Sequence, residues 1–251
     1  MRSLESVRPA FAGWGLTLYP EAAEAGARWY PTRRRDSWAP LREAEVDVQR
    51  AEVEAARRAK GKVRRYCAAN GLNRFASLTY RGVGCHEPLA LRADLAAFFR
   101  ALRRSLGGRP LPYLSVPEWH RTDHGLHAHF GIGRYVPRRL IESAWGHGFV
   151  HIKLIGNLPV GSGVLEEARI AARYLAKYAG KAFDVRRLKG LHRYEVAQGF
   201  QPRSEPIFGR RFSEIMERAT ERMGAPPSYV WRSEELWDWT GPPAAWMSWG
   251  R

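Results

Sequence analysis

Apolar and polar residues alternate along 126–134, where the sequence reads Leu-His-Ala-His-Phe-Gly-Ile-Gly-Arg. A period of two is typical of a β-strand with one face on a hydrophobic core and polar residues on the other. Short apolar runs bounded by turn residues predict three further strands, at 74–80, 112–119 and 149–155. The strands 112–119 and 126–134 are separated by a short polar turn and are expected to form a hairpin.

Between these strands the apolar residues recur at three and four positions, which predicts helices. The segment 88–106 places its large apolar side chains on one face: Leu91, Leu95, Phe98, Leu102 and Leu106. A short helix is expected from Pro137 to about Gly146, a longer one over about 165–182, and a charged one over 41–66. This order predicts an α+β fold, a central antiparallel sheet with helices packed on it.

His127 and His129 lie two residues apart in a predicted strand and therefore on one face of the sheet. Two neighbouring imidazoles are candidate metal ligands. The adjacent Gly131 and Gly133 leave open backbone where a bulky ligand can approach. The alternative is that both histidines are ordinary polar residues on a solvated sheet face.

A catalytic metal needs a third protein ligand and open coordination positions, and Glu118 is the best-placed carboxylate. In its strand, however, Glu118 shares a face with Leu114 and Val116 unless Pro117 introduces a bulge. Two histidines of the following turn could also reach such a site, although a turn favours solvated side chains: His120 and His124.

The predicted helix over about 165–182 has two different faces. The apolar face is expected to lie on the sheet: Ala168, Ala172, Leu175, Ala179 and Phe183. The other face carries two phenols and two ammonium groups: Tyr174, Lys177, Tyr178 and Lys181. Nearby positive charge favours a phenolate, which is a nucleophile. The alternative is a solvated helix surface on which lysine side chains lie along the tyrosine rings.

Taken together, these segments resemble three motifs of the HUH endonucleases, in the order found in rolling-circle replication initiators. Residues 75–80, Phe-Ala-Ser-Leu-Thr-Tyr, resemble the first motif, a strand ending in Leu-Thr-Tyr. His127-Ala128-His129, with Glu118 upstream, resembles the metal motif. Residues 174–181 resemble the tyrosine motif, in the paired-tyrosine version of initiators from small single-stranded DNA phages and some plasmids. The resemblance covers about residues 60–185.

The resemblance implies an HUH fold with a ferredoxin-like core. It also implies a divalent metal cofactor, Mg²⁺ or Mn²⁺, held by Glu118, His127 and His129. The implied activity is site-specific nicking and rejoining of single-stranded DNA at a replication origin.

In this family a tyrosine attacks the scissile phosphate, which leaves a 5′-phosphotyrosyl bond and a free 3′-hydroxyl that primes replication. Tyr174 and Tyr178 are the implied nucleophiles, and Lys177 and Lys181 are expected to favour the phenolate. With two tyrosines, one can hold the first cleaved end while the other attacks the junction regenerated after a full round.

The chain carries 41 Lys and Arg residues against 25 Asp and Glu, a formal charge of +16 over 251 residues. Such a charge attracts nucleic acid and makes binding depend on salt. Thr79 and a basic run before the first motif are expected to contact DNA, the run being Arg57, Arg58, Lys60, Lys62, Arg64 and Arg65. A solvated helix face is the alternative for the basic run.

Three consecutive segments are expected: a basic N-terminal extension with a helix over 1–66, an HUH catalytic domain over 67–190, and a Trp-rich C-terminal extension over 191–251. Irregular structure is expected over 1–40. The last 21 residues hold five of the ten tryptophans, which either stack on unpaired bases or pack the tail onto the domain: Trp231, Trp237, Trp239, Trp246 and Trp249.

Two cysteines, no secretory pattern and no long apolar stretch favour a cytoplasmic protein without a membrane span. The glycines at 161–163 and 180 lack the Lys-Ser/Thr that completes a phosphate-binding loop, so a host helicase and polymerase are the expected partners. The alternatives are a relaxase or transposase with the same chemistry, a non-catalytic nucleic-acid-binding protein and a zinc hydrolase.

Overall fold

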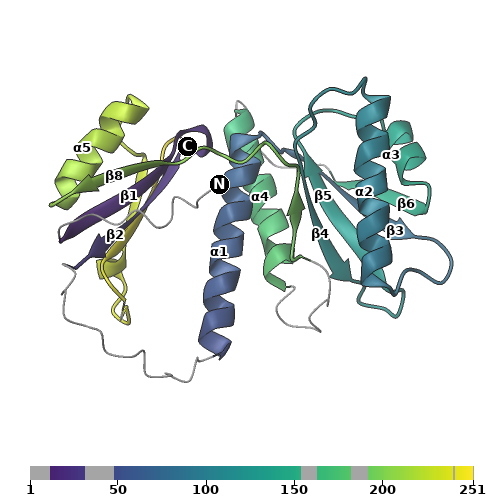
Figure 1. Cartoon of the computed structure of the whole chain (residues 1–251), viewed down its shortest axis with the longest axis horizontal. Helices are drawn as coiled ribbons and strands as arrows, with labels where there is room; N and C mark the ends of the chain where they lie inside the picture. The colour runs from purple at the N-terminus through teal and green to yellow at the C-terminus, as the bar shows by residue number, and fades with distance from the viewer. Residues whose placement is uncertain (1–11, 32–47, 154–162, 182–191, 240, 251) are drawn as a thin grey trace. The chain divides into compact units, whose positions relative to one another are not determined.

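The computed structural model describes five stretches of the chain: residues 12–31, 48–153, 163–181, 192–239 and 241–250 (Figure 1). The chain divides into two compact units, one formed by 47–201 and the other by 1–46 together with 202–251. Each unit contains a five-stranded sheet in which all paired strands are antiparallel. None of the described helices is long and apolar enough to cross a membrane.

The unit of residues 47–201 has the sheet order β6-β3-β5-β4-β7. Its elements, in chain order, are α1 (Val48–Ala69), β3 (Arg74–Tyr80), α2 (Pro88–Ser105), β4 (Tyr113–Trp119), β5 (Leu126–Ile132), α3 (Arg138–Trp145), β6 (Gly148–Lys153), α4 (Val164–Lys181) and β7 (Glu195–Val196). The predicted α+β fold is confirmed, and its central elements begin and end within about two residues of the expected positions.

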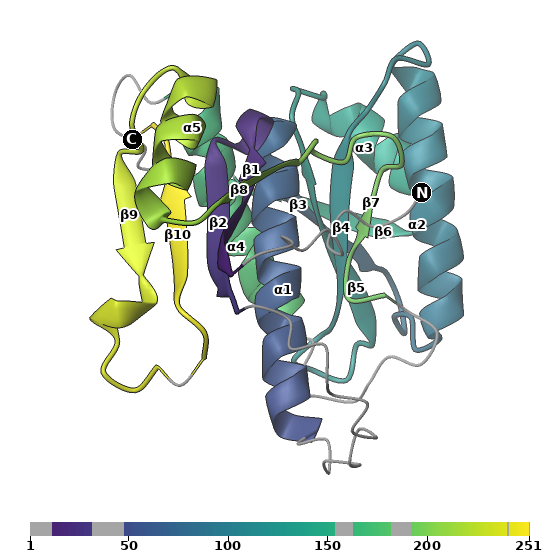
Figure 2. The same ribbon diagram turned by 60° about the vertical axis from the view of Figure 1, so that its left-hand side comes forward.

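Helices cover both faces of this sheet (Figures 1 and 2). On one face, α2 and α3 pack on alternate strand residues such as Leu78, Ala128 and Phe130. On the other face, α1 and α4 lie side by side and pack on Phe75, Leu114 and neighbouring residues. Because both faces are covered, the alternation along each strand separates two cores rather than a core from solvent.

The two covered faces resolve the position of Glu118 without a bulge. Regular pairing runs through Pro117, and Glu118 lies directly opposite His127. Opposite residues of an antiparallel pair point to the same side of the sheet, so Glu118 shares the face of both histidines. Val116 shares that face as well, because it packs against α1 and α4 rather than on the other core.

The expectation that Gly131 leaves room for a ligand is wrong. A Cβ atom at this position would come within 2.8 Å of Leu175 Cδ1. Gly133 is equally close to backbone, since its Cβ would lie 2.7 Å from the Asn70 carbonyl oxygen. These glycines allow α4 and the end of α1 to approach the sheet closely.

Leu175 anchors α4 on the histidine-bearing face and is fully buried. We expect Leu175→Ala to lower the free energy of unfolding by about 2–5 kcal/mol, because the lost side chain leaves a cavity beside Gly131. Urea denaturation followed by circular dichroism measures the change. The matched control is Leu89→Ala, at a residue of α2 that is 64% exposed, for which a change below about 0.5 kcal/mol is expected. Equal effects of the two variants would contradict this account of the packing.

The second unit has the sheet order β8-β1-β2-β10-β9. Its strands and helix are β1 (Gly13–Tyr19), β2 (Glu24–Tyr30), β8 (Glu205–Gly209), α5 (Phe212–Met223), β9 (Tyr229–Arg232) and β10 (Ala244–Ser248). The expected irregular structure is therefore wrong for residues 13–30, which form a hairpin. The two ends of the chain share one sheet, a division different from the three consecutive segments expected.

The C-terminal tryptophans mostly pack within this second unit. Trp249 is buried and donates a hydrogen bond from Nε1 to the Ala225 carbonyl, while Trp231, Trp239 and Trp246 are partly buried. Trp237 differs, since it is 97% exposed. The packing alternative thus accounts for four of the five tryptophans.

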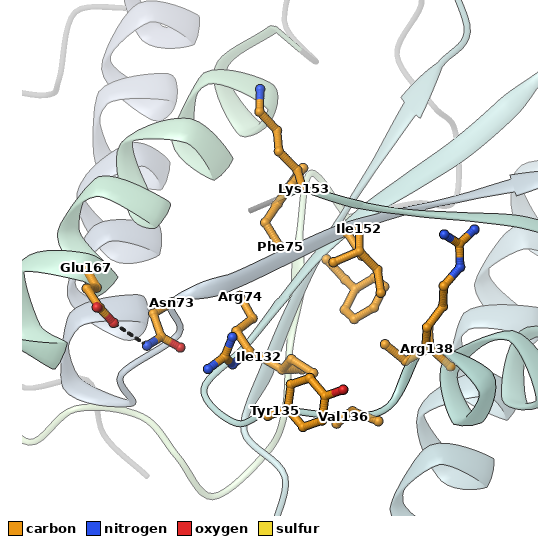
Figure 3. A pocket seen from close by; sticks show the side chains of 13 residues that line it. Asn73, Arg74, Phe75, Ile132, Tyr135, Val136, Arg138, Ile152, Lys153 and Glu167 are labelled. Carbon is orange, nitrogen blue, oxygen red and sulfur yellow. Dashed lines mark hydrogen bonds between the residues drawn. The ribbon is translucent and has the colours of Figure 1, made fainter. Parts of the chain in front are cut away.

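On the α3 side of the first sheet, a cavity of about 250 Å³ lies where β3 begins and β6 ends (Figure 3). Its wall includes Ile132 of β5 and Ile152 of β6, and charged residues lie around it. One of these, Lys153, also contacts α4.

Candidate metal and nucleophile site

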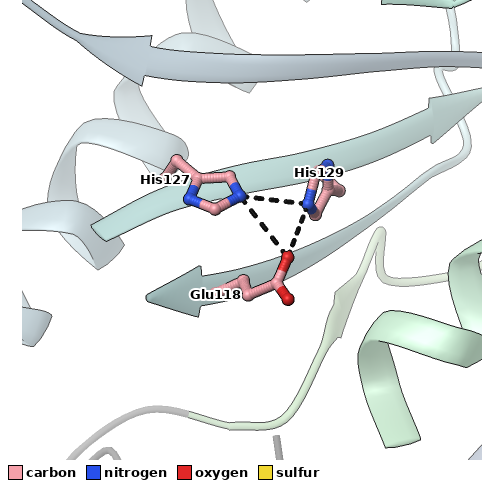
Figure 4. A group of neighbouring side chains, drawn as sticks. All are labelled: Glu118, His127 and His129. Atoms are coloured by element: carbon pink, nitrogen blue, oxygen red, sulfur yellow. Dashed lines mark hydrogen bonds and ion pairs between the residues drawn. The ribbon is translucent and has the colours of Figure 1, made fainter. Parts of the chain in front are cut away.

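Glu118, His127 and His129 meet where β4 and β5 lie side by side (Figure 4). His129 Nε2 lies 2.9 Å from Glu118 Oε2 and 3.1 Å from His127 Nε2, and His127 Nε2 lies 3.4 Å from the same carboxylate oxygen. The histidines are only 9% and 6% exposed, so they are not ordinary polar residues on a solvated face. One potential ligand atom from each residue lies within 4.8 Å of the others, and the group could hold a metal ion.

The chemistry of the donors fits a divalent cation. Burial by itself raises the pKa of Glu118, but hydrogen bonds from His127 and His129 and their positive charge outweigh it and lower the pKa to about 2. The carboxylate is therefore ionised at neutral pH and loses its charge only as the pH falls towards 2. An ionised carboxylate with two imidazoles is a set that transition metals and Mn²⁺ accept.

Ser77 of β3 orients one of the histidines. Its hydroxyl lies 2.7 Å from His129 Nδ1, so the Nε2 atom of the ring is turned towards Glu118. Such a contact fixes the orientation and tautomer of a metal-ligating histidine. His127 differs, because its Nδ1 is buried and has no hydrogen-bond partner within the described part of the chain.

We expect Ser77→Ala to weaken binding of Mn²⁺ by about tenfold to 100-fold, because His129 loses the contact that orients it. Isothermal titration of the purified protein with MnCl₂ measures the affinity. Ser115→Ala is a matched control, since this buried serine of β4 lies opposite Phe130, on the other side of the sheet. If both variants bound Mn²⁺ like the unaltered chain, Ser77 would have no role in the site.

Tyr174 of α4 lies one aromatic ring away from this cluster. The ring of Phe75 stacks on His129 with centroids 5.4 Å apart, and it meets Tyr174 edge to face at 4.7 Å. Phe75 comes from the first motif, so three separate sequence motifs converge here. The side chains of Tyr178 and Lys181, by contrast, lie outside the described residues.

Lys153, at the end of β6, supplies the positive charge beside Tyr174. Its Nζ donates a hydrogen bond of 3.2 Å to the Tyr174 hydroxyl and lies 4.3 Å from the ring centroid. The expected cation Lys177 is exposed on α4. The sequence alone did not single out Lys153, although its place opposite Phe75 in the predicted sheet could have indicated it.

The remaining expected DNA contacts fall in different places. Thr79 lies opposite His127 on the face that carries the cluster. The basic run lies on α1, where the first four residues are exposed and the last two partly buried: Arg57, Arg58, Lys60, Lys62, Arg64 and Arg65. Two turn histidines lie nearby without joining the cluster, since His120 packs edge to face on His127 and His124 bonds the Tyr80 carbonyl.

Comparison with known proteins gives one similarity. Residues 73–183 match a family model of replication-associated proteins of the ORF2 type. No curated protein and no solved structure matches the chain. The matched segment contains the Glu118–His127–His129 cluster, Phe75 and Tyr174, and this similarity supports a replication initiator type of protein.

Proposed function

We propose that this protein is a rolling-circle replication initiator that nicks and rejoins single-stranded DNA by tyrosine transesterification. One observation carries the proposal: a cluster able to hold a metal lies one ring away from Tyr174, inside the segment similar to replication-associated proteins. The basic composition supports a polyanionic substrate.

Glu118, His127 and His129 are proposed to hold the divalent cation, Mg²⁺ or Mn²⁺. When bound, such an ion polarises a phosphate and stabilises the charge that develops on its oxygens. Ser77 keeps His129 oriented for this role, and the low pKa of Glu118 keeps its carboxylate ionised.

The phenol oxygen of Tyr174 is the proposed nucleophile. It forms a bond to the phosphorus while the bond from phosphorus to the 3′-oxygen breaks, and the 3′-oxygen leaves with a proton as a hydroxyl group. The proton of the phenol passes to solvent or a nearby base. Because a phosphodiester is exchanged for another, the reverse reaction rejoins the strand without nucleotide hydrolysis.

Lys153 supports this role for Tyr174, because an ammonium group at 3.2 Å from the hydroxyl stabilises the phenolate. Tyr178 is proposed as a second nucleophile, one helical turn along α4, with Lys177 and Lys181 as further cations. It would attack the junction regenerated after a full round. A host helicase and polymerase are the proposed partners, and the cytoplasm is the proposed compartment.

The experiment that tests the proposal detects a covalent adduct. The purified chain is incubated with a fully degenerate pool of single-stranded DNA and with supercoiled plasmid from its host, in Mn²⁺ or in EDTA, and then run on a denaturing gel. A shifted protein band that requires Mn²⁺ is the expected result. DNA binding with strong salt dependence but no adduct with either substrate would overturn the proposal in favour of a non-catalytic binding protein.

A further inference from the structure

The cavity at the start of β3 and the end of β6 combines an apolar floor with a basic rim (Figure 3). The floor is formed by side chains of the α3-facing sheet surface and of α3: Ala76, Phe130, Ile132, Ile141 and Ile152. Its volume of about 250 Å³ is below the range of about 300–1,000 Å³ typical of sites for drug-sized ligands. The cavity is therefore suited to a single planar ring system.

Three cations and one tyrosine surround this floor. Arg74, Arg138 and Lys153 line the cavity and are exposed. The Arg138 charge is partly balanced by Glu142, whose Oε1 accepts a 2.7 Å bond from the guanidinium. Tyr135 is 70% exposed, and the Arg74 guanidinium lies 5.7 Å from its ring centroid. An aromatic surface beside exposed cations is the combination that binds unpaired nucleotides.

One side of the cavity offers hydrogen-bond acceptors. Asn73 Nδ2 donates a 2.6 Å bond to Glu167 Oε2, whereas Asn73 Oδ1 is buried and has no partner in the described part of the chain. Acceptors of this kind match the exocyclic amino groups of cytosine, adenine and guanine, and thymine has no such group. Glu167 would repel a phosphate, so the phosphates belong on the rim and the base inside.

Lys153 connects this cavity to the proposed nucleophile. It lines the cavity, and its Nζ donates to the Tyr174 hydroxyl at 3.2 Å. A strand whose phosphate lies at Tyr174 can therefore place a neighbouring base in the cavity.

We propose that this cavity binds one unpaired, amino-bearing base of single-stranded DNA next to the scissile phosphate, and so contributes to the choice of cleavage site. The inference rests on the proposed function. Arg74 and Lys153 contact the flanking phosphates, Tyr135 stacks on the base, and Asn73 Oδ1 accepts from its amino group.

Binding without catalysis tests the proposal. Fluorescein-labelled d(C)12, d(A)12 and d(T)12 are titrated with the purified chain in EDTA, and anisotropy gives each affinity at several salt concentrations. We expect d(C)12 or d(A)12 to bind at least about fivefold more tightly than d(T)12. Tyr135→Ala, and Ile152→Trp, which fills the cavity, are each expected to weaken binding of the preferred oligomer by about tenfold and to remove the preference.

The controls separate the base pocket from general charge. Arg74→Ala is expected to lower the salt slope by about one, and Arg139→Ala, at an exposed residue of α3 outside the cavity, matches it in charge and is expected to leave the base preference unchanged. Equal binding of all three oligomers, or unchanged binding by both Tyr135→Ala and Ile152→Trp, would overturn the proposal. So would dCMP competing as well per molecule as d(C)12, which would indicate a mononucleotide site.

This assay is independent of nicking. If the pocket variants lose base preference but no covalent adduct ever forms, base binding stands and the nicking proposal fails. If the adduct forms and the pocket variants bind every oligomer like the unaltered chain, the nicking proposal stands and the base pocket is refuted.

Discussion

Replacing both tyrosines, Tyr174→Phe with Tyr178→Phe, is expected to abolish the covalent DNA adduct, a decrease of at least about 10,000-fold. Phenylalanine keeps the aromatic ring, and with it the edge-to-face contact of Tyr174 with Phe75, but has no oxygen that can bond to phosphorus. The measurement is the amount of metal-dependent adduct on a denaturing gel, with binding of the same DNA measured in EDTA. DNA binding is expected to change by less than about threefold.

The single variants separate the two proposed roles. Each one is expected to retain the first cleavage and to lose the strand transfer that needs a second nucleophile. Tyr229→Phe, at a residue 52% exposed in the other unit, is the matched control and is expected to have no effect. Full adduct formation by the double variant would refute tyrosine chemistry, and unchanged initiation and termination by Tyr178→Phe would refute the second nucleophile.

Replacing both histidines, His127→Ala with His129→Ala, is expected to remove bound metal and to lower adduct formation by at least about 1,000-fold. A carboxylate alone is a poor site, because Glu118 would be the one remaining ligand of the cluster. Loss of several kcal/mol of charge stabilisation in the transition state corresponds to this decrease. Equilibrium dialysis against Mn²⁺ measures the bound metal, and the denaturing gel measures the adduct.

His192→Ala removes an exposed histidine outside the cluster and is the control for general effects of losing an imidazole. Circular dichroism shows whether the double variant remains folded, which matters because both histidines are buried. A folded double variant that formed the adduct at an undiminished rate would show that the cluster does not serve catalysis.

Local periodicity explains why so much of the central unit could be predicted. The strand at 126–132 and its partner at 113–119 are joined by a short turn, so their pairing and the closeness of Glu118 to His127 depend on neighbouring sequence. The apolar stripe of α4, represented by Leu175, likewise follows from residues a few positions apart.

The second unit shows where local pattern fails. Its hairpin over 13–30 has small residues such as Ala25 and Ala27 in core positions, which give a weak hydrophobic alternation. Its sheet is completed by β8 and β10, which come from the other end of the chain. A strand that depends on such distant partners cannot be recognised from its own residues alone.

The sequence by itself determined the elements of the central unit, the candidate ligands Glu118, His127 and His129, and the candidate nucleophile Tyr174. Only the tertiary structure decided that helices cover both faces of the sheet, which places Glu118 on the face of the histidines. It also decided that Lys153 contacts Tyr174. The physical reason is that periodicity reports which face a side chain occupies, whereas its neighbours depend on how separate elements pack.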